Sequence, residues 1–274
     1  MFKIIIMALL IFIGMVGYDN ITDKAQPTTP VQQEQQKVSK HEKSAAMALF
    51  TSLLPPKEEW PSPVHKFYLA FNMDEVIDPI RQNPNWTGLD AMSRDIPQAL
   101  IAIEDHAFYN HGAIAVEGIL RAALANINAG EVVQGGSTLT QQFVKNVFLS
   151  HEQSMERKIE ETVLSLMLED NYSKDEILEL YLNTTYFGAG STGIKQASRT
   201  YFGKAPSALT LAEAAVIASL PYAPTSLNPL ENPEGCKKRQ LLVLAAMHKY
   251  GMINQGQLAE AKAEKIHLTN GTVM

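Results

Sequence analysis

Capping residues followed by apolar residues at helical spacing recur through the second half of the chain. In the capping-box pattern a Ser or Thr is followed three residues later by Gln or Glu, and the pairs are Thr138 with Gln141, Ser173 with Glu176, and Thr210 with Glu213. Each pair predicts a helix that starts there, and the first should run through Leu149. Few segments show the two-residue alternation of strands. The fold class is therefore predicted to be mainly α.

Apolar periodicity predicts further helices. One begins near Ile96, with Pro97 in its first turn, and continues through the segment ALIAIEDHAF. Another covers Ile114–Ile127, and a last pair lies between Glu234 and Glu264 with a break near Gly251.

Two other segments carry specific expectations. Between Ser154 and Glu169 an amphipathic helix is expected, and its core stripe is predicted to be Met155, Ile159, Val163 and Leu166. The mixture of aromatic and aliphatic residues at Val64–Phe71 favours a strand.

The first 60 residues have a different composition. Ile4–Tyr18 is uncharged and almost wholly apolar, but it is shorter than the ~20 residues of a typical spanning helix. No small-x-small cleavage site follows it. Residues 1–18 are predicted to be a membrane anchor or an uncleaved signal, with the remainder of the chain outside the cytoplasm. Polar residues 19–60 are predicted to be a flexible linker, and residues 61–270 the functional domain.

Composition narrows the function classes. The 274 residues suffice for one large domain or two small ones. A net charge of −6 argues against a nucleic-acid partner, whose binding face would be basic. The single Cys236 excludes an internal disulfide and has no partner pattern for nucleophilic catalysis. No His pair has a zinc-helix spacing, so a His-based metal site is not expected.

Two glutamates stand in contexts that suggest acid–base chemistry. Glu104 follows an apolar run in IAIEDHAFYNHG, where loss of solvation would raise its pKa toward that of a usable base. The alternative is a solvated helix-end residue. Glu161 shares a helix face with Arg157 and Lys158, opposite the Met155 and Ile159 stripe. The alternative there is a set of ordinary ion pairs on a solvated face.

The segment GGSTLTQQFVKN, Gly135 to Asn146, lies between the glutamates. Its glycines allow close backbone approach, and the Ser137 and Thr138 hydroxyls with the following amides could bind an anion. Gln141, Gln142 and Lys145 follow within about one turn. An ordinary turn and N-cap is the alternative. The cluster from Phe143 to Leu149 is either core or a surface that dips into a membrane.

Taken together, these segments resemble the peptidoglycan glycosyltransferases of family 51, which occur as monofunctional transglycosylases and as a module of class A penicillin-binding proteins. Five blocks match in order between about Trp86 and Leu268: EDHAFYNHG, GGSTLTQQFVKN, RKIEE, ILELYLNTTYFGAGSTGIKQASRTYFGK and LTLAEAAVIASLPYAPTSLNP. The resemblance implies a mainly α, lysozyme-like domain with a small membrane-facing jaw.

The resemblance also implies roles for individual residues. Glu104 is similar to the general base that takes a proton from the 4-hydroxyl of the acceptor sugar of lipid II. The growing glycan strand is then transferred with inversion, which gives a β-1,4 link and releases undecaprenyl pyrophosphate. Glu161 resembles the glutamate that assists this departure, directly or by placing a divalent metal such as Mg or Mn. The cations on the pyrophosphate side would be Lys145, Arg157 and Lys158, with Arg121 as a further candidate, and the residues that line the site would be Gln142, Ser137 and Thr138.

One motif departs from the family pattern. After His111 the family often has x-Gly-x-Asp, whereas this chain reads Gly112, Ala113, Ile114, Ala115, which we expect to alter a helix start rather than the chemistry. Neither Ser-x-x-Lys nor Lys-Thr-Gly occurs, so no transpeptidase module is expected.

The expected location is the inner membrane of a bacterium, as a single-pass protein with its domain on the outer side. The expected partners are lipid II, the glycan strand and, beyond these, cell-wall synthesis or division proteins. The competing functions are a lytic transglycosylase or muramidase and a non-catalytic scaffold that binds lipid II.

Overall fold

The computed structural model describes residues 68–69, 72–119, 127, 135–149 and 154–274. The chain divides into two compact units, Met1–Asp78 and Pro79–Met274. The predictions for residues 1–18 and 19–60 and for Arg121 lie outside the described residues. So does half of the 114–127 helix, of which residues 116–119 and 127 are helical and residues 114–115 are not. No helix in the described ranges is long and apolar enough to cross a membrane.

In the first unit, the described residues are helical where a strand was expected. The Asn72 amide donates to the Tyr68 carbonyl at 3.1 Å, which is the spacing of an α-helical turn. The strand prediction for Val64–Phe71 is therefore wrong at Tyr68 and Leu69, since local helical hydrogen bonding outweighs a weak β propensity. Helix α4 (Asp74–Arg81) begins in this unit.

Most of the described elements of the second unit are helices, which confirms the mainly α prediction. Its longer helices are α5 (Asp95–Glu104), α7 (Leu139–Phe148), α8 (Met155–Asn171), α9 (Lys174–Thr184), α10 (Ile194–Phe202), α11 (Leu211–Ser219), α12 (Pro233–Lys249) and α13 (Gln255–Ala263). Short 3-10 turns cover Leu89–Ala91, Phe108–Asn110, Pro206–Ala208 and Leu220–Tyr222. Among the described residues, β pairing is limited to the bridges Tyr186–Thr192 and His267–Val273.

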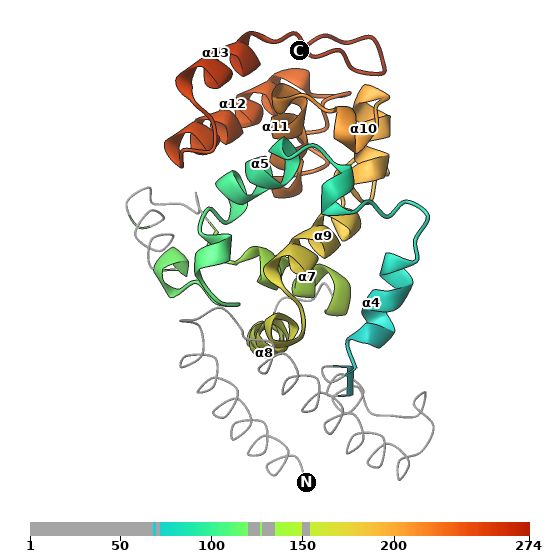
Figure 1. Ribbon diagram of the computed structural model, residues 1–274, viewed down its shortest axis with the longest axis vertical. Coiled ribbons are helices and arrows are strands. Elements are labelled where there is room, and N and C mark those ends of the chain that lie inside the picture. The colour runs from blue at the N-terminus through green and yellow to red at the C-terminus, as the bar shows by residue number, and fades with distance from the viewer. Residues whose placement is uncertain (1–67, 70–71, 120–126, 128–134, 150–153) are drawn as a thin grey trace. The chain divides into compact units, whose positions relative to one another are not determined.

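The helices of this unit pack in two groups (Figure 1). Helix α11 packs against α5 and α12, and α12 also packs against α13. Every residue of α11 from Ala212 to Ser219 is buried, and its alanines allow close approach of the neighbouring helices. Helix α7 packs against α8 and α9, and α10 contacts both α9 and α11. Helix α10 and the hydrogen bond from Leu139, at the start of α7, to Asp105, just after α5, link the two groups.

The three predicted capping boxes are confirmed. Thr138, Ser173 and Thr210 are the N-caps of α7, α9 and α11, and each side chain accepts a backbone N–H three residues on. Such a cap contributes about 1 kcal/mol and fixes where each helix begins. The last helical pair, interrupted near Gly251, is also confirmed as α12 and α13.

Helix α5 is shorter than predicted. It ends at Glu104, and the next residue, Asp105, has φ −156° and ψ 71°, so the helix does not continue through Phe108. The reason is not local. The Asp105 carboxylate accepts the backbone N–H of Leu139 at 3.1 Å and lies 2.7 Å from His111 Nε2, and both contacts require the chain to turn there.

The predicted core stripe of α8 is wrong at its first two positions. Met155 is 79% exposed and Ile159 is 56% exposed, whereas Glu161 is only 2% exposed and Leu164 and Leu168 are buried. Positions 161, 164 and 168 also share one helix face. The spacing of residues in the sequence was therefore compatible with either of two faces of α8 packing against the core. The face with Glu161 turns inward because Lys158 neutralises that carboxylate.

The aromatic cluster on α7 belongs mainly to the core. Phe143 and Val144 are fully buried, and the Phe143 and Phe148 rings meet edge to face at 6.2 Å. The alternative that Phe143 reaches into a membrane is therefore wrong.

Gly188, in the loop after α9, lies close against the backbone at Pro224. Gly188 has φ +88°, and a Cβ there would lie 2.3 Å from the carbonyl oxygen of Pro224. Gly188→Ala should therefore lower the free energy of unfolding by about 2–4 kcal/mol, measured by urea denaturation. The matched control is Gly190→Ala, at φ +71° with no atom within 4 Å, which should cost about 1–2 kcal/mol. Equal losses for the two variants would contradict the close approach.

Candidate active site

Glu104 lies at the last turn of α5 and is held by residues from two other helices. Gln142 on α7 donates from Nε2 to Glu104 Oε2 at 3.0 Å. Tyr181 on α9 is fully buried and donates from its hydroxyl to Gln142 Oε1, also at 3.0 Å. The carboxylate that the sequence singled out is therefore fixed through a carboxamide rather than by a direct ion pair.

Opposing effects act on the ionisation of Glu104. Burial raises its pKa, and the hydrogen bond from Gln142 and the charges of Arg239 and Lys145 offset part of that increase. The Asp105 charge raises the pKa further. A carboxyl group with a raised pKa that still has cations nearby can be ionised and basic, as a general base must be. Burial, and then the charge of Glu104, raise the pKa of Tyr181, so its hydroxyl remains a donor.

Asp105 joins the segment after α5 to the start of α7. One oxygen accepts the Leu139 N–H at 3.1 Å and the other accepts from His111 Nε2 at 2.7 Å. His111 Nδ1 lies 2.5 Å from the carbonyl oxygen of Gly112, so both ring nitrogens face acceptors. Burial lowers the pKa of His111, but these two hydrogen bonds outweigh it and the net pKa is raised. The charged imidazolium is thereby favoured beside Asp105.

Glu161 is buried on α8 and forms an ion pair with Lys158 one turn earlier. Lys158 Nζ also lies 3.3 Å from the Ser137 hydroxyl, in the segment that leads into α7. Arg157 is half-buried on the same helix. The structure thus brings Glu161, Lys158 and Ser137 together, while Gln142, one turn into α7, contacts Glu104.

Thr138, which the sequence placed among the residues that line the site, is a buried N-cap at the start of α7. It is 1% exposed, and its hydroxyl donates to the Ala113 carbonyl at 2.8 Å and accepts the Gln141 N–H at 3.1 Å. These bonds fix the entry to α7 and leave the hydroxyl no open surface. Lys145, by contrast, is exposed and near enough to act on the Glu104 charge.

Sequence reasoning missed Arg239, which belongs to α12. Its guanidinium lies 4.1 Å from the centre of the Tyr222 ring, a cation–π distance, and its charge lowers the pKa of Glu104. Among the missed residues, Tyr181 and Asp105 stand inside matched motifs, but their partners are far away in sequence. Arg239 stands outside every matched block, and only the packing of α12 against α5 indicates its role.

The described residues do not supply a ligand set for a metal ion. Within the described ranges, no three His, Cys, Asp or Glu side chains gather in a suitable arrangement, and Glu161 forms an ion pair with Lys158. The expected Mg or Mn does not fit this donor set, and no step is assigned to a metal.

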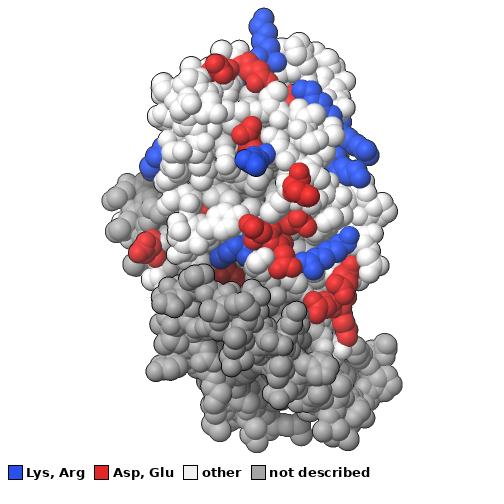
Figure 2. Space-filling view, viewed as in Figure 1, with Lys and Arg blue, Asp and Glu red and all other residues white. Residues whose placement is uncertain are grey.

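Charged side chains are interspersed on the face that Figure 2 shows. Its described part presents Lys and Arg in small separate groups beside Asp and Glu, rather than as a continuous basic stripe. A nucleic-acid interface would need such a stripe.

Comparison with known proteins identifies the family. Residues 73–248 match the family model described as Transglycosylase. A penicillin-binding protein 1A of Neisseria flavescens is 44% identical over 68% of this chain and 23% of its own length. A protein of Cupriavidus necator that bears the name of a transglycosylase is 40% identical over 71% of this chain and 84% of its own length.

Other relatives are much longer than this chain. Penicillin-binding protein 1F of Bacillus subtilis is 39% identical over 72% of this chain and 28% of its own length. This chain therefore spans about a quarter of the penicillin-binding proteins that it matches. Because the family model covers more than half of the chain and the Cupriavidus protein is matched over most of its length, the chain belongs to the transglycosylases of glycosyltransferase family 51.

Proposed function

We propose that this protein is a peptidoglycan glycosyltransferase that polymerises lipid II into glycan strands. The observation that carries the proposal is Glu104, a half-buried carboxylate with a raised pKa that is held in place by Gln142. Family membership and the match to penicillin-binding proteins support the same reaction. No described feature favours a hydrolase or a non-catalytic scaffold over this assignment.

In the proposed reaction Glu104 acts as the general base. It takes the proton from the 4-hydroxyl of the acceptor lipid II as the oxygen attacks the anomeric carbon of the growing strand. The bond from that carbon to the pyrophosphate breaks, and undecaprenyl pyrophosphate leaves with both bonding electrons. Attack opposite the leaving group inverts the anomeric centre and gives a β-1,4 link. General base catalysis of this kind contributes on the order of 10²–10⁴ in rate.

The departing pyrophosphate needs cations, and we assign Lys145, Lys158 and Arg157 to it. The Lys158–Glu161 ion pair supports a positioning role for Glu161, because a buried carboxylate holds the lysine beside Ser137. A preorganised cation stabilises developing negative charge without a cost of reorganisation during the reaction. Arg121 remains a further candidate from the sequence.

We also propose that α8 faces the membrane as part of the jaw of this family. Met155 and Ile159 are the exposed apolar side chains that support this assignment, and they lie close in sequence to Lys158. Such a face would bring the cations to the surface where a lipid pyrophosphate lies. The predicted anchor over residues 1–18 would place the domain on the outer side of the inner membrane, near cell-wall synthesis or division proteins.

Glu104→Gln should abolish polymerisation while the fold is retained. The amide keeps the shape of the side chain and an oxygen for Gln142, but it cannot accept the proton. We expect glycan synthesis from purified lipid II to fall by at least about 100-fold, measured by gel separation of labelled strands. The melting temperature should stay close to that of the wild type.

If Glu104→Gln polymerises lipid II as fast as the wild type does, Glu104 is not the general base. If the wild type makes no polymer but releases soluble fragments from sacculi, the hydrolase alternative is correct. Binding of lipid II without either product would favour the scaffold.

Arg239→Gln should shift the acid limb of the pH–rate profile to higher pH. Removing the positive charge destabilises the ionised form of Glu104, so its pKa rises and the base becomes protonated at a higher pH. The measurement is initial polymerisation rate across pH. The matched control is Lys238→Gln, which removes the neighbouring exposed cation of α12 and should leave the profile unchanged. Identical profiles for Arg239→Gln and wild type would contradict electrostatic coupling.

The membrane face of α8 can be tested in a variant that lacks residues 1–18. We expect residual binding to anionic liposomes, and Met155→Ser combined with Ile159→Ser should reduce it several-fold by removing exposed apolar area. Co-sedimentation measures the bound fraction. The control is Leu242→Ser, which removes an apolar side chain that is exposed on α12. If the control lowers binding as much as the α8 pair does, the assigned face is wrong.

A further inference from the structure

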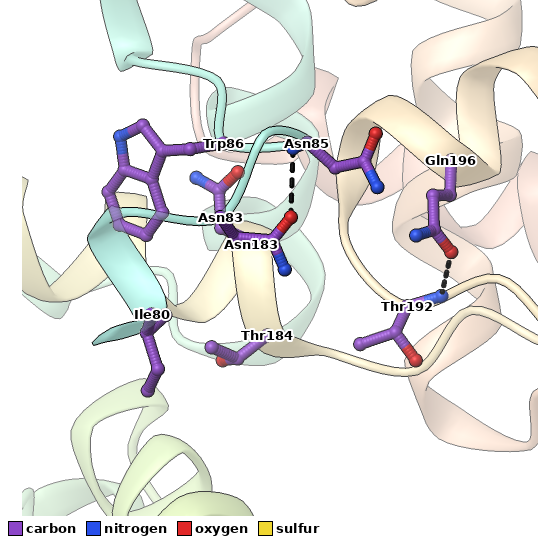
Figure 3. A pocket seen from close by; sticks show the side chains of 8 residues that line it. All are labelled: Ile80, Asn83, Asn85, Trp86, Asn183, Thr184, Thr192 and Gln196. Atoms are coloured by element: carbon purple, nitrogen blue, oxygen red, sulfur yellow. Dashed lines mark hydrogen bonds between the residues drawn. The ribbon is translucent and has the colours of Figure 1, made fainter. Parts of the chain in front are cut away.

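A pocket lies beside the carboxyl end of α9, in the unit formed by residues 79–274. It has a volume of about 230 Å³ and is lined by Ile80, Asn83, Asn85, Trp86, Asn183, Thr184, Thr192 and Gln196. Figure 3 shows the Trp86 indole on one side and Thr192 with Gln196 on the other, with asparagines between them. Residues from four segments therefore form one concave site.

Part of the polar lining holds the pocket together. Asn183 accepts the Thr87 N–H at 2.8 Å, and it donates to the carbonyls of Thr87 at 2.9 Å and Glu179 at 2.8 Å. The Lys195 ammonium donates to the Pro84 carbonyl at 2.9 Å, which ties the 83–86 loop to α10. The walls are thus fixed before any ligand binds, and preorganisation of this kind reduces the entropic cost of binding.

Other polar groups of the pocket remain available. Asn83 and Gln196 use their carboxamide oxygens to accept the amides of Asn85 and Thr192, at 2.8 and 3.2 Å, which leaves their NH₂ groups as donors. Within the described part of the chain, the Asn85 carboxamide makes no recorded hydrogen bond and offers both a donor and an acceptor. The site can therefore exchange hydrogen bonds with a ligand that carries hydroxyl and amide groups.

The charge and size of the pocket restrict that ligand further. None of its lining residues is Lys, Arg, Asp or Glu, so it offers no charge to a phosphate or a cation. Its volume is below the ~300–1,000 Å³ of pockets for drug-sized molecules, which favours a single ring. The indole and Ile80 provide apolar surface for the ring face or for an acetyl methyl group.

This pocket is separate from the site around Glu104. Tyr181 points from α9 toward Gln142, whereas Asn183 is two positions further along the helix. None of Glu104, Gln142 and Tyr181 lines the pocket, so the two sites share none of these side chains.

We propose that this pocket binds one uncharged, acetamido-bearing sugar ring and is a saccharide site distinct from the catalytic one. The uncharged, hydrogen-bonding lining beside the Trp86 indole is the observation on which the ligand class rests. That the natural ligand is an N-acetylglucosamine unit of the glycan strand rests on the proposed function.

The test is direct binding of chitotriose, three β-1,4-linked N-acetylglucosamine units, to the full chain in detergent. Saturation-transfer NMR and a titration give the dissociation constant. Wild type and Glu104→Gln should bind equally, since Glu104 does not line the pocket. Asn85→Ala should raise the dissociation constant about three- to tenfold by removing a hydrogen-bonding side chain. Trp86→Ala, checked for folding by circular dichroism, should weaken binding at least as much.

The matched control is Gln82→Ala, which removes an exposed carboxamide of the same loop that does not line the pocket. It should bind chitotriose as the wild type does. Absence of saturation transfer to the wild type, or equal binding by Asn85→Ala and Trp86→Ala, would overturn the proposal. If the protein binds chitotriose but makes no polymer from lipid II, the proposed polymerase function is wrong and the proposed saccharide site still holds.

Discussion

The turn at Asp105 is the constraint on which the candidate site depends. Its carboxylate accepts a backbone N–H from the first residue of α7 and a hydrogen bond from His111, so it ends α5 and anchors α7. The residue before this turn is Glu104, and Gln142 lies one turn into α7. A displacement of either helix end would separate these two side chains, because a hydrogen bond weakens steeply with distance and angle. The position of Glu104 thus depends on the backbone turn at Asp105 as well as on its own hydrogen bond to Gln142.

Features with local causes could be predicted from the sequence. The capping boxes at Thr138, Ser173 and Thr210 need only residues three positions apart, and the structure confirms all three. The end of α5 could not be predicted in this way, since Asp105 finds its partner at Leu139. The outward face of α8 was missed for a related reason. Burial of Glu161 depends on its pairing with Lys158, and hydropathy counts such a carboxylate as a surface residue.

The residues of the candidate site also divide into those that local sequence motifs predicted and those that depend on contacts between distant segments. The motifs located Glu104, Gln142, Lys158 and Glu161, and the structure pairs Glu104 with Gln142 of α7 and Lys158 with Glu161 within α8. Arg239 and the pocket beside Trp86 could not be found from the spacing of residues in the sequence. Arg239 reaches the site through the packing of α12 on α5, and the pocket combines a loop after α4 with the ends of α9 and α10. Such contacts between distant segments appear only when the chain is folded.

The link between Tyr181, Gln142 and Glu104 orients the Glu104 carboxylate. Because the Tyr181 hydroxyl remains protonated, it donates to Gln142 Oε1 and turns the Nε2 donor of that amide toward Glu104 Oε2. That carboxylate oxygen is occupied by a group that can give a hydrogen bond but cannot receive a proton. Gln142 therefore contributes a fixed donor and no base, so in the proposed reaction this amide cannot take over the proton. The proton that Glu104 would take from a substrate has to leave through another group or through solvent, and each turnover depends on that second transfer.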